Sequence, residues 1–558
     1  METEGFKLRE GFRGNPKLRP AGLIIPYTED QVKEILKCRK DIVYFAENYY
    51  KIITLDKGLQ TIKLYDFQKD LLRTIQNEKR IIVLASRQVG KTTTYAIFCL
   101  WYILFYPEKS IAITANKERT AIEILDRIKT AYQELPIWLQ QGIIGWGRRE
   151  IMLENNSKIL AASTSSTAIR GFSMNVLIID EMAFIPRNIF NDFWSSVYPV
   201  ISSGQDSKVI IVSTPNKKNH FYKFWIDAKE GRNLFKPVFV HWSQVPGRDE
   251  KWVEETKRSV GELTWMQEFE CKFIGAADTL IEPTVLEQLR FKYPIKDSII
   301  HEKLGSNSEF LYLYEEVKPG HTYVIGVDSS KIKQGESTGD GTSIQVLDVT
   351  EIPFKQVAHF YVEPPAKFHY LDIIPVTYQL AKYFNNALVF IENNDIGQEI
   401  ADGLAFDYEY ENVYFQKPDL PGFRQTTKTR HIGLMNLKTL IEKHQLIIND
   451  WVTIEQLSSF VKKGKKFQAA PGNYDDAVMA LTHALFFLQV PGFEWIVTKK
   501  ELIEQKKISD EIEKFKQKMR KELEDQYEDL PLPVLNDENT EQIIDGYLIQ
   551  EVKILNNF

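Results

Sequence analysis

A short loop in the first half of the chain has the residue types that bind a nucleoside triphosphate. The segment SRQVGKT (86–92) follows an apolar strand pattern and runs into a helical pattern, with Gly90, Lys91 and Thr92 at its end. In such a loop, backbone N–H groups bind phosphate oxygens, the lysine reaches the β- and γ-phosphates, and the threonine ligates Mg²⁺. The usual pattern has a glycine where this chain has Ala85. Alanine is also small, so we interpret the segment as a phosphate-binding loop.

A second motif supplies the carboxylates that ATP hydrolysis requires. The segment VLIIDE (176–181) places Asp180 at the end of an apolar strand and Glu181 just beyond it. An aspartate in that position can hold a magnesium ion, and the glutamate can orient and polarise the attacking water. Acidic residues are common after buried strands, but this pair follows the phosphate loop in the expected order and at the expected separation. Together the two motifs predict an ATP site with Mg²⁺.

Several residues near these motifs are further candidates for the same chemistry. Gln68 could bond to adenine, or it could simply begin a helix. Arg87 could stabilise transition-state charge in cis, and Arg170, in a polar loop, could do so in trans if subunits form a ring. Ser213 and Thr214 end a strand and could relay the state of the γ-phosphate, or form a plain turn. The candidate nucleotide contacts are therefore Gln68, Ser86, Arg87, Gln88, Gly90, Lys91, Thr92, Thr93 and Asp180.

Acidic residues in the second half form another candidate site. Asp328 ends the strand pattern YVIGVD, Glu392 ends LVFIE, and Asp475 and Asp476 begin a helical pattern. These positions can converge at one edge of a sheet, with Asp340 from a loop as an outer ligand. Carboxylates bind Mg²⁺, and paired ions stabilise the attacking and leaving oxygens of a phosphodiester. A single aspartate at a strand end is more often a turn residue. The order Asp, Glu, Asp nevertheless predicts an RNase H-like nuclease site with Mg²⁺ or Mn²⁺.

Basic residues near this acidic set predict contacts with a DNA backbone. The segment SSFVKKGKKFQAA (458–470) reads as two strand ends joined by a lysine-flanked glycine turn, and TTKTRH (426–431) adds a lysine and an arginine. Such residues bind phosphates without reading the base sequence, although a solvated turn has the same composition. The candidates are Lys428, Arg430, Lys462, Lys463, Lys465 and Lys466.

The elements that must position these residues alternate between strand and helix patterns. Near-continuous Ile, Val and Leu runs in the first half are typical of parallel strands covered on both faces, and we expect strands at 80–86, 110–116, 150–154, 157–163, 175–181 and 207–214. In the second half we expect strands at 321–330, 342–350, 354–362 and 387–395, then a helix after residue 473. The predicted fold class is α/β, with a mostly parallel P-loop ATPase sheet followed by an RNase H-like (RuvC-type) α/β domain.

Length and composition indicate several domains in one globular chain. The 558 residues exceed what one core holds, and the hydrophobic content of 43% and charged content of 26% are ordinary for globular proteins. The net charge of −6 neither requires nor excludes nucleic acid, because binding depends on local patches. We expect four segments: an N-terminal arm (1–59), an ATPase domain with its linker (60–300), a nuclease domain (301–495), and a charged helix with a flexible acidic tail (496–558).

The sequence argues against secretion and membrane insertion. The longest apolar run, residues 96–106, is shorter than the ~18 residues that a membrane span needs. The N-terminus has no signal-peptide pattern, and the three cysteines are too scattered for a disulfide framework or a zinc site. We therefore expect a protein of a reducing, intracellular compartment that makes no contact with a membrane.

The motifs, taken in order, resemble those of one protein family. Between about residues 60 and 490 the chain is similar to the large terminase subunit of tailed double-stranded DNA bacteriophages, the ATP-driven genome-packaging motor, in SRQVGKT, VLIIDEMAFIP, STPNKKNHFYKFW, GVDSS, FIENNDIG and YDDAVMAL. The resemblance implies an ASCE-type ATPase and an RNase H-like headful nuclease acting on double-stranded DNA in the host cell cytoplasm. It also implies a homo-oligomeric ring during packaging, with subunits that can be monomeric in solution, docked on the portal protein of a procapsid and helped by a small terminase subunit.

The resemblance also assigns roles to individual positions. It implies that the phosphate-loop lysine, the magnesium aspartate and the catalytic glutamate are Lys91, Asp180 and Glu181. The nuclease ligands map to Asp328, Glu392 and one aspartate of the pair Asp475 and Asp476. Asp476 is the preferred member of this pair, although both have the right chemistry.

Two other classes of protein would share part of this pattern. A DNA helicase with an attached nuclease has the first two motifs and the STP segment, but it needs a second RecA-like lobe with an arginine-rich motif, and we find none after residue 215. A non-catalytic scaffold that binds ATP only to order itself predicts nucleotide binding without turnover. A phosphate-release assay with and without DNA separates this scaffold from a motor.

Overall fold

The computed structural model describes residues 11–490, apart from 55, 165–168, 170, 171, 203, 205, 276, 277, 331–340, 364, 365, 367, 395 and 465. The predicted site residues Asp340, Arg170 and Lys465 therefore lie outside the described residues. The predicted charged helix and tail at 496–558 also lie outside them.

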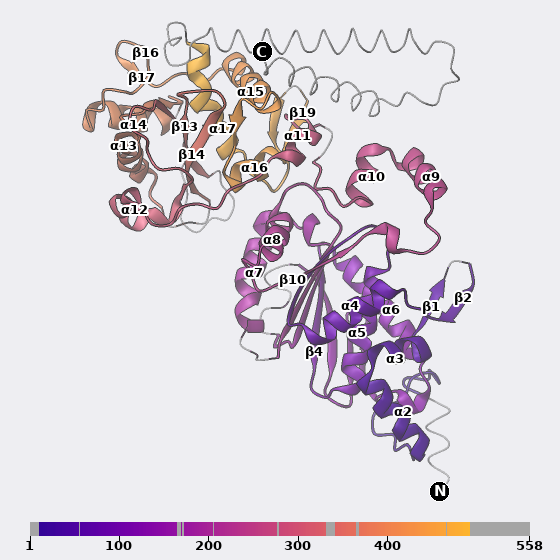
Figure 1. Cartoon of the computed structure of the whole chain (residues 1–558). Coiled ribbons are helices and arrows are strands. Elements are labelled where there is room, and N and C mark those ends of the chain that lie inside the picture. Colours follow the sequence, from indigo (N-terminus) through magenta and orange to yellow (C-terminus); the bar gives the residue numbers. More distant parts are fainter. Residues whose placement is uncertain are drawn as a thin grey trace, which may run out of the picture.

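Two α/β lobes follow one another along the chain (Figure 1). The first lobe contains an eight-stranded sheet in the order β10-β3-β9-β8-β4-β7-β6-β5. All neighbours from β10 to β7 are parallel, which confirms the predicted mostly parallel sheet. The strands are β3 (Arg80–Ala85), β4 (Ser110–Ala115), β5 (Ile143–Gly147), β6 (Glu150–Leu153), β7 (Lys158–Ser163), β8 (Val176–Asp180), β9 (Lys208–Ser213) and β10 (Lys236–Val240).

Two strands at one end of this sheet depart from the parallel pattern. The expected strand at 150–154 is β6, and it runs antiparallel to both β5 and β7. Only a short turn separates β6 from β7, and a short turn can join only antiparallel neighbours. At the other end, β10 was not expected from the sequence, because its segment KPVFV is short and only partly buried.

Successive side chains along each strand of the first sheet point to opposite faces, and each face is covered by a layer of helices. Ile81, Val83 and Ala85 of β3 pack into one core, whereas Ile82 and Leu84 pack into the other. The helices on the first side are α2 (Glu29–Lys40), α3 (Ile42–Tyr49), α4 (Asp66–Asn77), α5 (Lys91–Phe105) and α6 (Glu118–Gln133). Those on the second side are α7 (Arg187–Ser202) and α8 (His220–Lys229).

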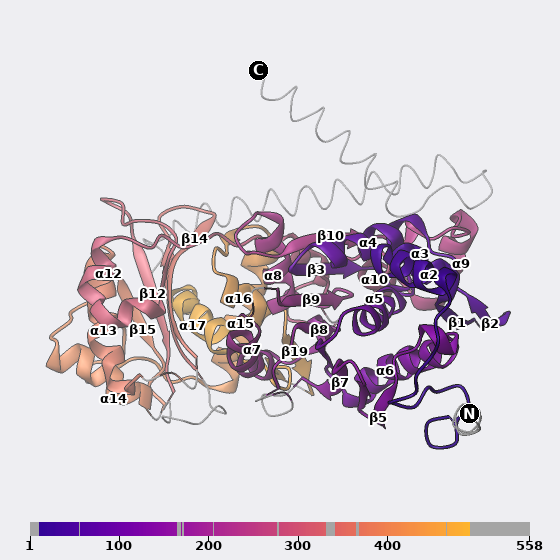
Figure 2. The same cartoon turned by 90° about the horizontal axis from the view of Figure 1, so that it is seen from below.

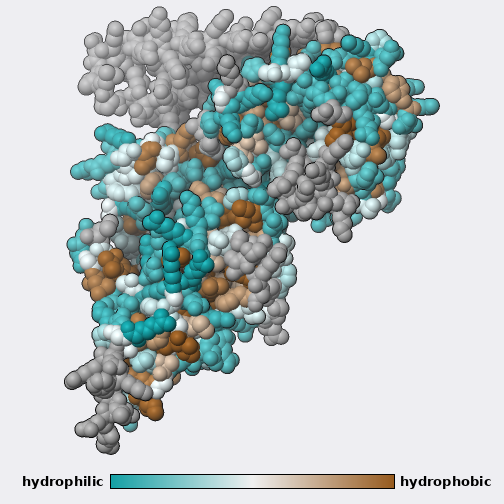
Figure 3. Space-filling view, turned by 180° about the vertical axis from the view of Figure 1, so that it is seen from behind, coloured by the Kyte–Doolittle hydropathy of each residue, from teal (hydrophilic) through white to brown (hydrophobic). Residues whose placement is uncertain are grey.

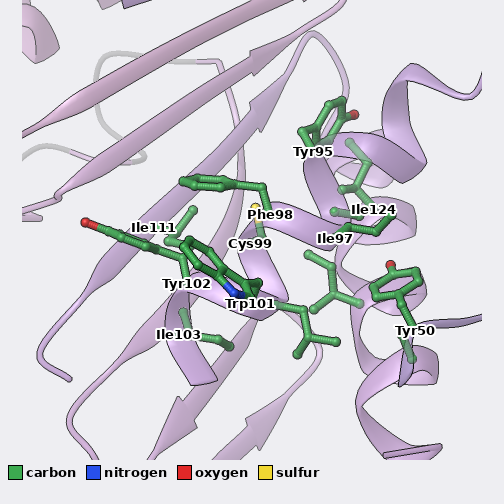
Figure 4. Packing of buried hydrophobic residues seen from close by; sticks show 14 of the residues in the cluster. Tyr50, Tyr95, Ile97, Phe98, Cys99, Trp101, Tyr102, Ile103, Ile111 and Ile124 are labelled. Carbon is green, nitrogen blue, oxygen red and sulfur yellow. The ribbon is translucent and has the colours of Figure 1, made fainter. Parts of the chain in front are cut away.

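Helix α5, which directly follows the phosphate loop, is buried nearly all round. Figure 4 shows Phe98 and Tyr102 on one side of the helix, where their rings stack with centroids 5.3 Å apart. Ile97 lies on the other side, toward Ile124 of α6 and Tyr50 (Figure 4). A helix that is apolar on every side belongs in a protein core. The apolar run at residues 96–106 therefore lies almost entirely in a core helix. Because this helix is buried and begins at Lys91, it holds the C-terminal end of the phosphate loop in place.

The second lobe is built on a six-stranded sheet. Its order is β11-β14-β13-β12-β15, and β18 pairs with the first two residues of β14. Strands β12, β13 and β14 form an antiparallel meander, and β15 adds to β12 in parallel. Three antiparallel strands with a fourth strand parallel to the first are the arrangement of RNase H-like folds, which confirms this part of the predicted fold class. The strands are β11 (Leu311–Leu313), β12 (Tyr323–Asp328), β13 (Thr342–Asp348), β14 (Phe354–Val362), β15 (Leu388–Ile391) and β18 (Leu446–Ile447).

Helices cover both faces of this second sheet as well. One face is covered by α12 (Ile299–Leu304), α13 (Ile373–Tyr383) and α14 (Ile396–Asp402), and the other by α11 (Pro283–Gln288), α15 (Thr427–Glu442), α16 (Trp451–Leu457) and α17 (Asp476–Ala484). Leu280, Ile281 and Leu286 lie in this second core, although they precede residue 300. The domain boundaries given above remain a prediction.

Smaller elements complete the described chain. The hairpins are β1 (Lys51–Thr54) with β2 (Gly58–Thr61), β16 (Phe415–Lys417) with β17 (Leu420–Pro421), and β19 (Phe460–Lys463) with β20 (Lys466–Ala469). Two further helices, α9 (Glu250–Val260) and α10 (Glu262–Glu268), follow β10. The face shown in Figure 3 is mainly hydrophilic, with apolar residues in scattered places. Among the described residues, none of the helices combines the length and the apolar character needed to cross a bilayer.

A close approach between β12 and α17 makes Gly326 a sensitive position. A Cβ atom at Gly326 would lie 2.1 Å from the carbonyl oxygen of Ala480 and 2.1 Å from the backbone nitrogen of Ala484. Backbone atoms cannot move aside as a flexible side chain can, so Gly326→Ala should push α17 off the sheet. Overpacking of this kind costs about 1–3 kcal/mol, so we expect a clear fall in the melting temperature.

Thermal denaturation followed by circular dichroism measures this effect. Gly204→Ala is a matched control, because a Cβ there would meet nothing closer than the Cβ of Ser207 at 3.5 Å. Equal melting temperatures for the two variants would show that α17 does not depend on the close approach at Gly326.

Candidate functional site

The phosphate loop has the backbone conformation that directs N–H groups into a common space. Gln88 and Gly90 have φ angles of 58° and 81°, and α5 begins at Lys91, directly after Gly90. A Cβ at Gly90 would lie 2.5 Å from Nε2 of Gln68. Gln68 also caps α4, since its Oε1 accepts a hydrogen bond from the Tyr65 nitrogen at 3.1 Å. Gln68 thus begins a helix, and its amide also lies against the loop.

The segment after β10 holds the first residues of the loop in place. The Ser86 hydroxyl donates to the Phe269 carbonyl at 2.6 Å, and the Arg87 nitrogen donates to the Glu268 carbonyl at 2.7 Å. The Arg87 side chain is exposed and pairs with Glu268 at 3.5 Å. The end of α10 and the residue after it are therefore hydrogen-bonded to the first two residues of the loop.

Parallel pairing brings the acidic pair to the same sheet edge as the loop. The loop follows β3, Ser213 ends β9 and Asp180 ends β8, and these three strands are neighbours. Asp180 is buried, and its Oδ1 has no hydrogen-bond partner. Burial raises the pKa of Asp180 to about 6, with Lys91 acting to lower it and Glu181 to raise it further. A buried carboxylate oxygen without a hydrogen-bond partner, whose pKa is influenced by Lys91, suits a magnesium ion carried with a nucleotide.

The turn after this acidic pair is tied to the end of β9. The Ser213 hydroxyl accepts from the Ala183 nitrogen at 3.1 Å, and the amide of Asn219 donates to the Ala183 carbonyl at 2.6 Å. Thr214 is buried beside them. Of the predicted coupling residues, Ser213 is thus in contact with the turn that follows Glu181.

An arginine that the sequence did not single out also reaches the loop. Arg248 Nη2 donates to the Gln88 carbonyl at 2.9 Å, and its guanidinium lies over the Trp252 ring, 4.5 Å from the centroid. Its Nη1 is buried without a partner. The only sequence signal was an arginine in a turn, PGRDE, distant from both motifs.

The second acidic set gathers at one edge of the second sheet. Val327 of β12 pairs with Ile391 of β15 in parallel, so the residues that follow them, Asp328 and Glu392, leave the sheet side by side. Helix α17 packs across β12 and begins with Asp476 (Figure 2). Burial, together with repulsion from Asp476 and Glu392, raises the pKa of Asp328 well above its ordinary value. Carboxylates that repel one another in this way are a donor set that a divalent cation would neutralise, so the residues fit Mg²⁺ or Mn²⁺.

A histidine that the sequence reading missed belongs to this site. Ligand atoms of Asp328, Glu392 and His483 all lie within 4.8 Å of one another. The signal that could have found it is the spacing of His483 from Asp476, seven residues along one helix and therefore on the same face.

The neighbouring aspartates Asp475 and Asp476 have different surroundings. Asp476 is buried and accepts a hydrogen bond from the Tyr361 hydroxyl at 3.4 Å. Asp475 accepts from the Ala469 nitrogen at 3.2 Å and lies 3.8 Å from Arg430 Nη2. Repulsion from Asp476 raises the pKa of Asp328 more than repulsion from Asp475 does. Asp476 is thus the member of the pair that acts more strongly on Asp328.

A cavity of about 310 Å³ opens beside Glu392. Arg430, His431 and Lys466 are among the residues that line it. Lys462 and Lys463 are exposed on the same hairpin as Lys466, and Lys428 is exposed at the start of α15. The described basic residues of the sequence prediction therefore lie on the elements that surround the cavity.

A partly buried ion-pair network joins the two lobes. Arg187, six residues after Glu181, pairs with Glu363 at 2.8 Å and with Glu455 of α16. The rings of Tyr222 in α8 and Trp451 in α16 also stack between the lobes, with centroids 5.8 Å apart. The start of α7 is therefore held by ion pairs to the lobe that carries the second acidic set.

Fold and site geometry together define a class: a two-lobed α/β protein with a phosphate-loop motif in one lobe and a cluster of carboxylates in the other, RNase H-like lobe. Residues 82–288 match the family described as terminase large subunit, T4likevirus-type, N-terminal. The chain is 25% identical over 345 residues to the large terminase subunit of Thermus phage G20c and 26% identical over 345 residues to that of Thermus virus P23-45. Each alignment covers 58% of this chain and 63% of the relative, so the chain spans less than two thirds of those proteins.

The chain also resembles solved structures of phage large terminases. The crystal structure of the HK97 bacteriophage large terminase aligns with a TM-score of 0.45 and 14% identity, over 80% of this chain and 99% of that one. The family match and the curated relatives confirm the resemblance drawn from the motifs: the chain is similar to phage large terminase subunits.

Proposed function

We propose that this protein is a viral DNA-packaging motor subunit. It hydrolyses ATP to move double-stranded DNA into a procapsid, and it cuts concatemeric DNA with a metal-dependent endonuclease. The observation that carries this proposal is the presence in one chain of a phosphate loop facing Asp180 and of a separate carboxylate cluster, around Asp328, beside a basic cavity. The names of the relatives support it.

In the proposed ATP site each residue has a separate task. Lys91 and the loop N–H groups bind the phosphates, and Thr92 and Asp180 would hold Mg²⁺, which would supply positive charge beside the phosphate oxygens. Glu181 orients the attacking water and accepts its proton. Arg87, after release from Glu268, and Arg248 are positioned to meet charge that develops on the nucleotide.

In the proposed nuclease site the carboxylates of Asp328, Glu392 and Asp476 would hold divalent ions, and such ions would supply Lewis-acid chemistry to a phosphodiester. The chain's own contribution is to keep these carboxylates together and to hold DNA along the basic hairpin. Backbone contacts by lysine and arginine bind DNA without base specificity, so cutting should depend little on sequence.

The proposed link between the two sites runs through Arg187. A change at Glu181 alters the turn that Ser213 holds, and that turn leads directly into the ion pairs of Arg187 with the second lobe. Movement of the ATPase lobe is thereby passed to DNA bound by the other lobe.

The proposed partners follow from the same role. They are double-stranded DNA, the portal protein of the procapsid, a small terminase subunit and further copies of this chain in a ring, where Arg170 would act on a neighbour's nucleotide. The proposed place of action is the cytoplasm of the host cell.

Two assays on the full chain test the proposal. We expect phosphate release from ATP that rises when double-stranded DNA is added, and plasmid cleavage that requires Mg²⁺ or Mn²⁺. Nucleotide binding without turnover would indicate a scaffold instead. ATP-dependent strand separation would indicate a helicase with an attached nuclease.

A further inference from the structure

The carboxylate of Asp476 is confined by two other residues of the second lobe. The hydroxyl of Tyr361, in β14, donates a hydrogen bond to Oδ2 of Asp476 at 3.4 Å. Both residues are almost completely buried, with 3% and 4% of their surfaces exposed. Gly341 lies against the same oxygen, since a Cβ atom there would be 2.9 Å from Oδ2. Oδ2 therefore has little room to turn away from the tyrosine hydroxyl.

Gln456 of α16 connects this tyrosine to the first turn of α17. Helices α16 and α17 pack against each other (Figure 2). The side-chain oxygen of Gln456 accepts from the Ala477 nitrogen at 2.7 Å, and its side-chain nitrogen donates to the Tyr361 hydroxyl at 3.2 Å. The first N–H groups of a helix have no partner within it, so Gln456 satisfies one of them and fixes the residue next to Asp476.

The hydrogen bonds of this group run in one direction. A backbone N–H can only donate, so the contact with Ala477 determines that the amide nitrogen of Gln456 faces Tyr361. Because that nitrogen donates to the tyrosine oxygen, the tyrosine proton is left to point at Asp476, whose ionised carboxylate can only accept. The Tyr361 ring is itself held, since it packs with Val452 of α16 and Ala477 of α17. Side chains from β14 and α16 thus specify the orientation of the Asp476 carboxylate.

We propose that Tyr361 and Gln456 are positioning residues for phosphodiester cleavage, which hold the Asp476 carboxylate in the orientation that it needs toward Asp328. The inference rests on the nuclease activity given under Proposed function. Of the charged groups around Asp328, Asp476 raises its pKa the most, so a rotated Asp476 carboxylate would alter the centre of the site. Residues that orient the acting groups in this way commonly contribute about 10- to 100-fold to activity or ion affinity.

Tyr361→Phe tests the proposal through the loss of a single hydroxyl. In supercoiled-plasmid nicking by the full chain, kcat should fall about 10- to 100-fold, while KM for DNA should stay within about twofold because the basic hairpin is unchanged. The affinity of the nucleotide-free chain for Mn²⁺, measured by titration, should fall about tenfold or more. Tyr410→Phe is the matched control, since it removes a similarly buried hydroxyl of the same lobe, which donates to the Ala387 carbonyl at 2.7 Å, just before β15. This control should cut DNA and bind Mn²⁺ as the wild type does.

Gln456→Met is a second variant, because methionine keeps the length of the side chain and removes the amide. If Gln456 acts through the Tyr361 hydroxyl, the kcat of the double variant should lie within about twofold of the slower single variant, since residues that act as a unit are not additive. Losses that multiply in the double variant would overturn this connection. If Gln456→Met does not fold, Tyr361→Phe and its control still decide the role of the tyrosine.

The failure of this proposal can be told apart from the failure of the nuclease proposal. Wild-type kcat and Mn²⁺ affinity in Tyr361→Phe would overturn the positioning role, and so would equal losses in Tyr410→Phe. If Asp328→Asn abolishes cutting in the same assay, the nuclease proposal stands in either case. Cutting by Asp328→Asn at the wild-type rate would overturn both.

Discussion

Asp328→Asn should lower the rate of metal-dependent plasmid cleavage by about 1000-fold, because a metal ion contributes several kcal/mol to the transition state and this change removes a central ligand. ATP turnover by the same preparation should stay within about twofold of the wild type, since Asp328 lies in the other lobe from the phosphate loop. Supercoiled-plasmid nicking and phosphate release, measured side by side, give both numbers.

The variant should remain folded, and this separates a lost ligand from a lost structure. Burial and repulsion from neighbouring carboxylates raise the pKa of Asp328 well above its ordinary value, so a neutral asparagine relieves an unfavourable charge. Its melting temperature should therefore not fall below that of the wild type. Asp372→Asn, at an exposed position of the same lobe, is the control and should cut normally. Undiminished cleavage by Asp328→Asn would refute the site.

Glu181→Gln should reduce ATP turnover by about 10²- to 10⁴-fold, the usual contribution of a general base. ATP binding should survive, because the phosphates are bound by the loop and Lys91. Lys91→Ala is the informative comparison, since it should weaken nucleotide binding itself. Single-turnover phosphate release and fluorescent-nucleotide binding separate the two effects, and normal turnover by Glu181→Gln would show that another residue orients the water.

The main architecture could be predicted because its signals are local. Buried strands such as β3 and β8 are continuous apolar runs, and their ends carry the phosphate loop and Asp180. The carboxyl ends of parallel strands meet at one sheet edge, and the same rule brings together Asp328 and Glu392. These sites follow from strand order and from the residues at or just beyond the end of each strand.

The parts that escaped prediction depend on packing between distant segments. Arg248 reaches the loop only because α9 and α10 fold back onto it, and nothing in its own turn signals that contact. His483 joins the carboxylates because Gly326 lets α17 approach β12 closely. The antiparallel β5 and the edge strand β10 are too short, or too exposed, for their patterns to stand out.

The ion pairs of Arg187 illustrate the same limit. The segment MAFIPR reads as the continuation of the acidic motif, and its sequence gives no sign that Arg187 pairs with Glu363 and Glu455 in the other lobe. Contacts between lobes depend on surfaces built from many segments, so they emerge only from the folded chain.

The central claim is that Asp328, Glu392 and Asp476 share divalent ions. Anomalous diffraction from crystals soaked in Mn²⁺, with data collected near the manganese edge, measures this most directly. The account predicts a strong anomalous peak among these three carboxylates, absent from crystals of Asp328→Asn. A map with no peak there, in crystals that bind Mn²⁺ elsewhere, would contradict it.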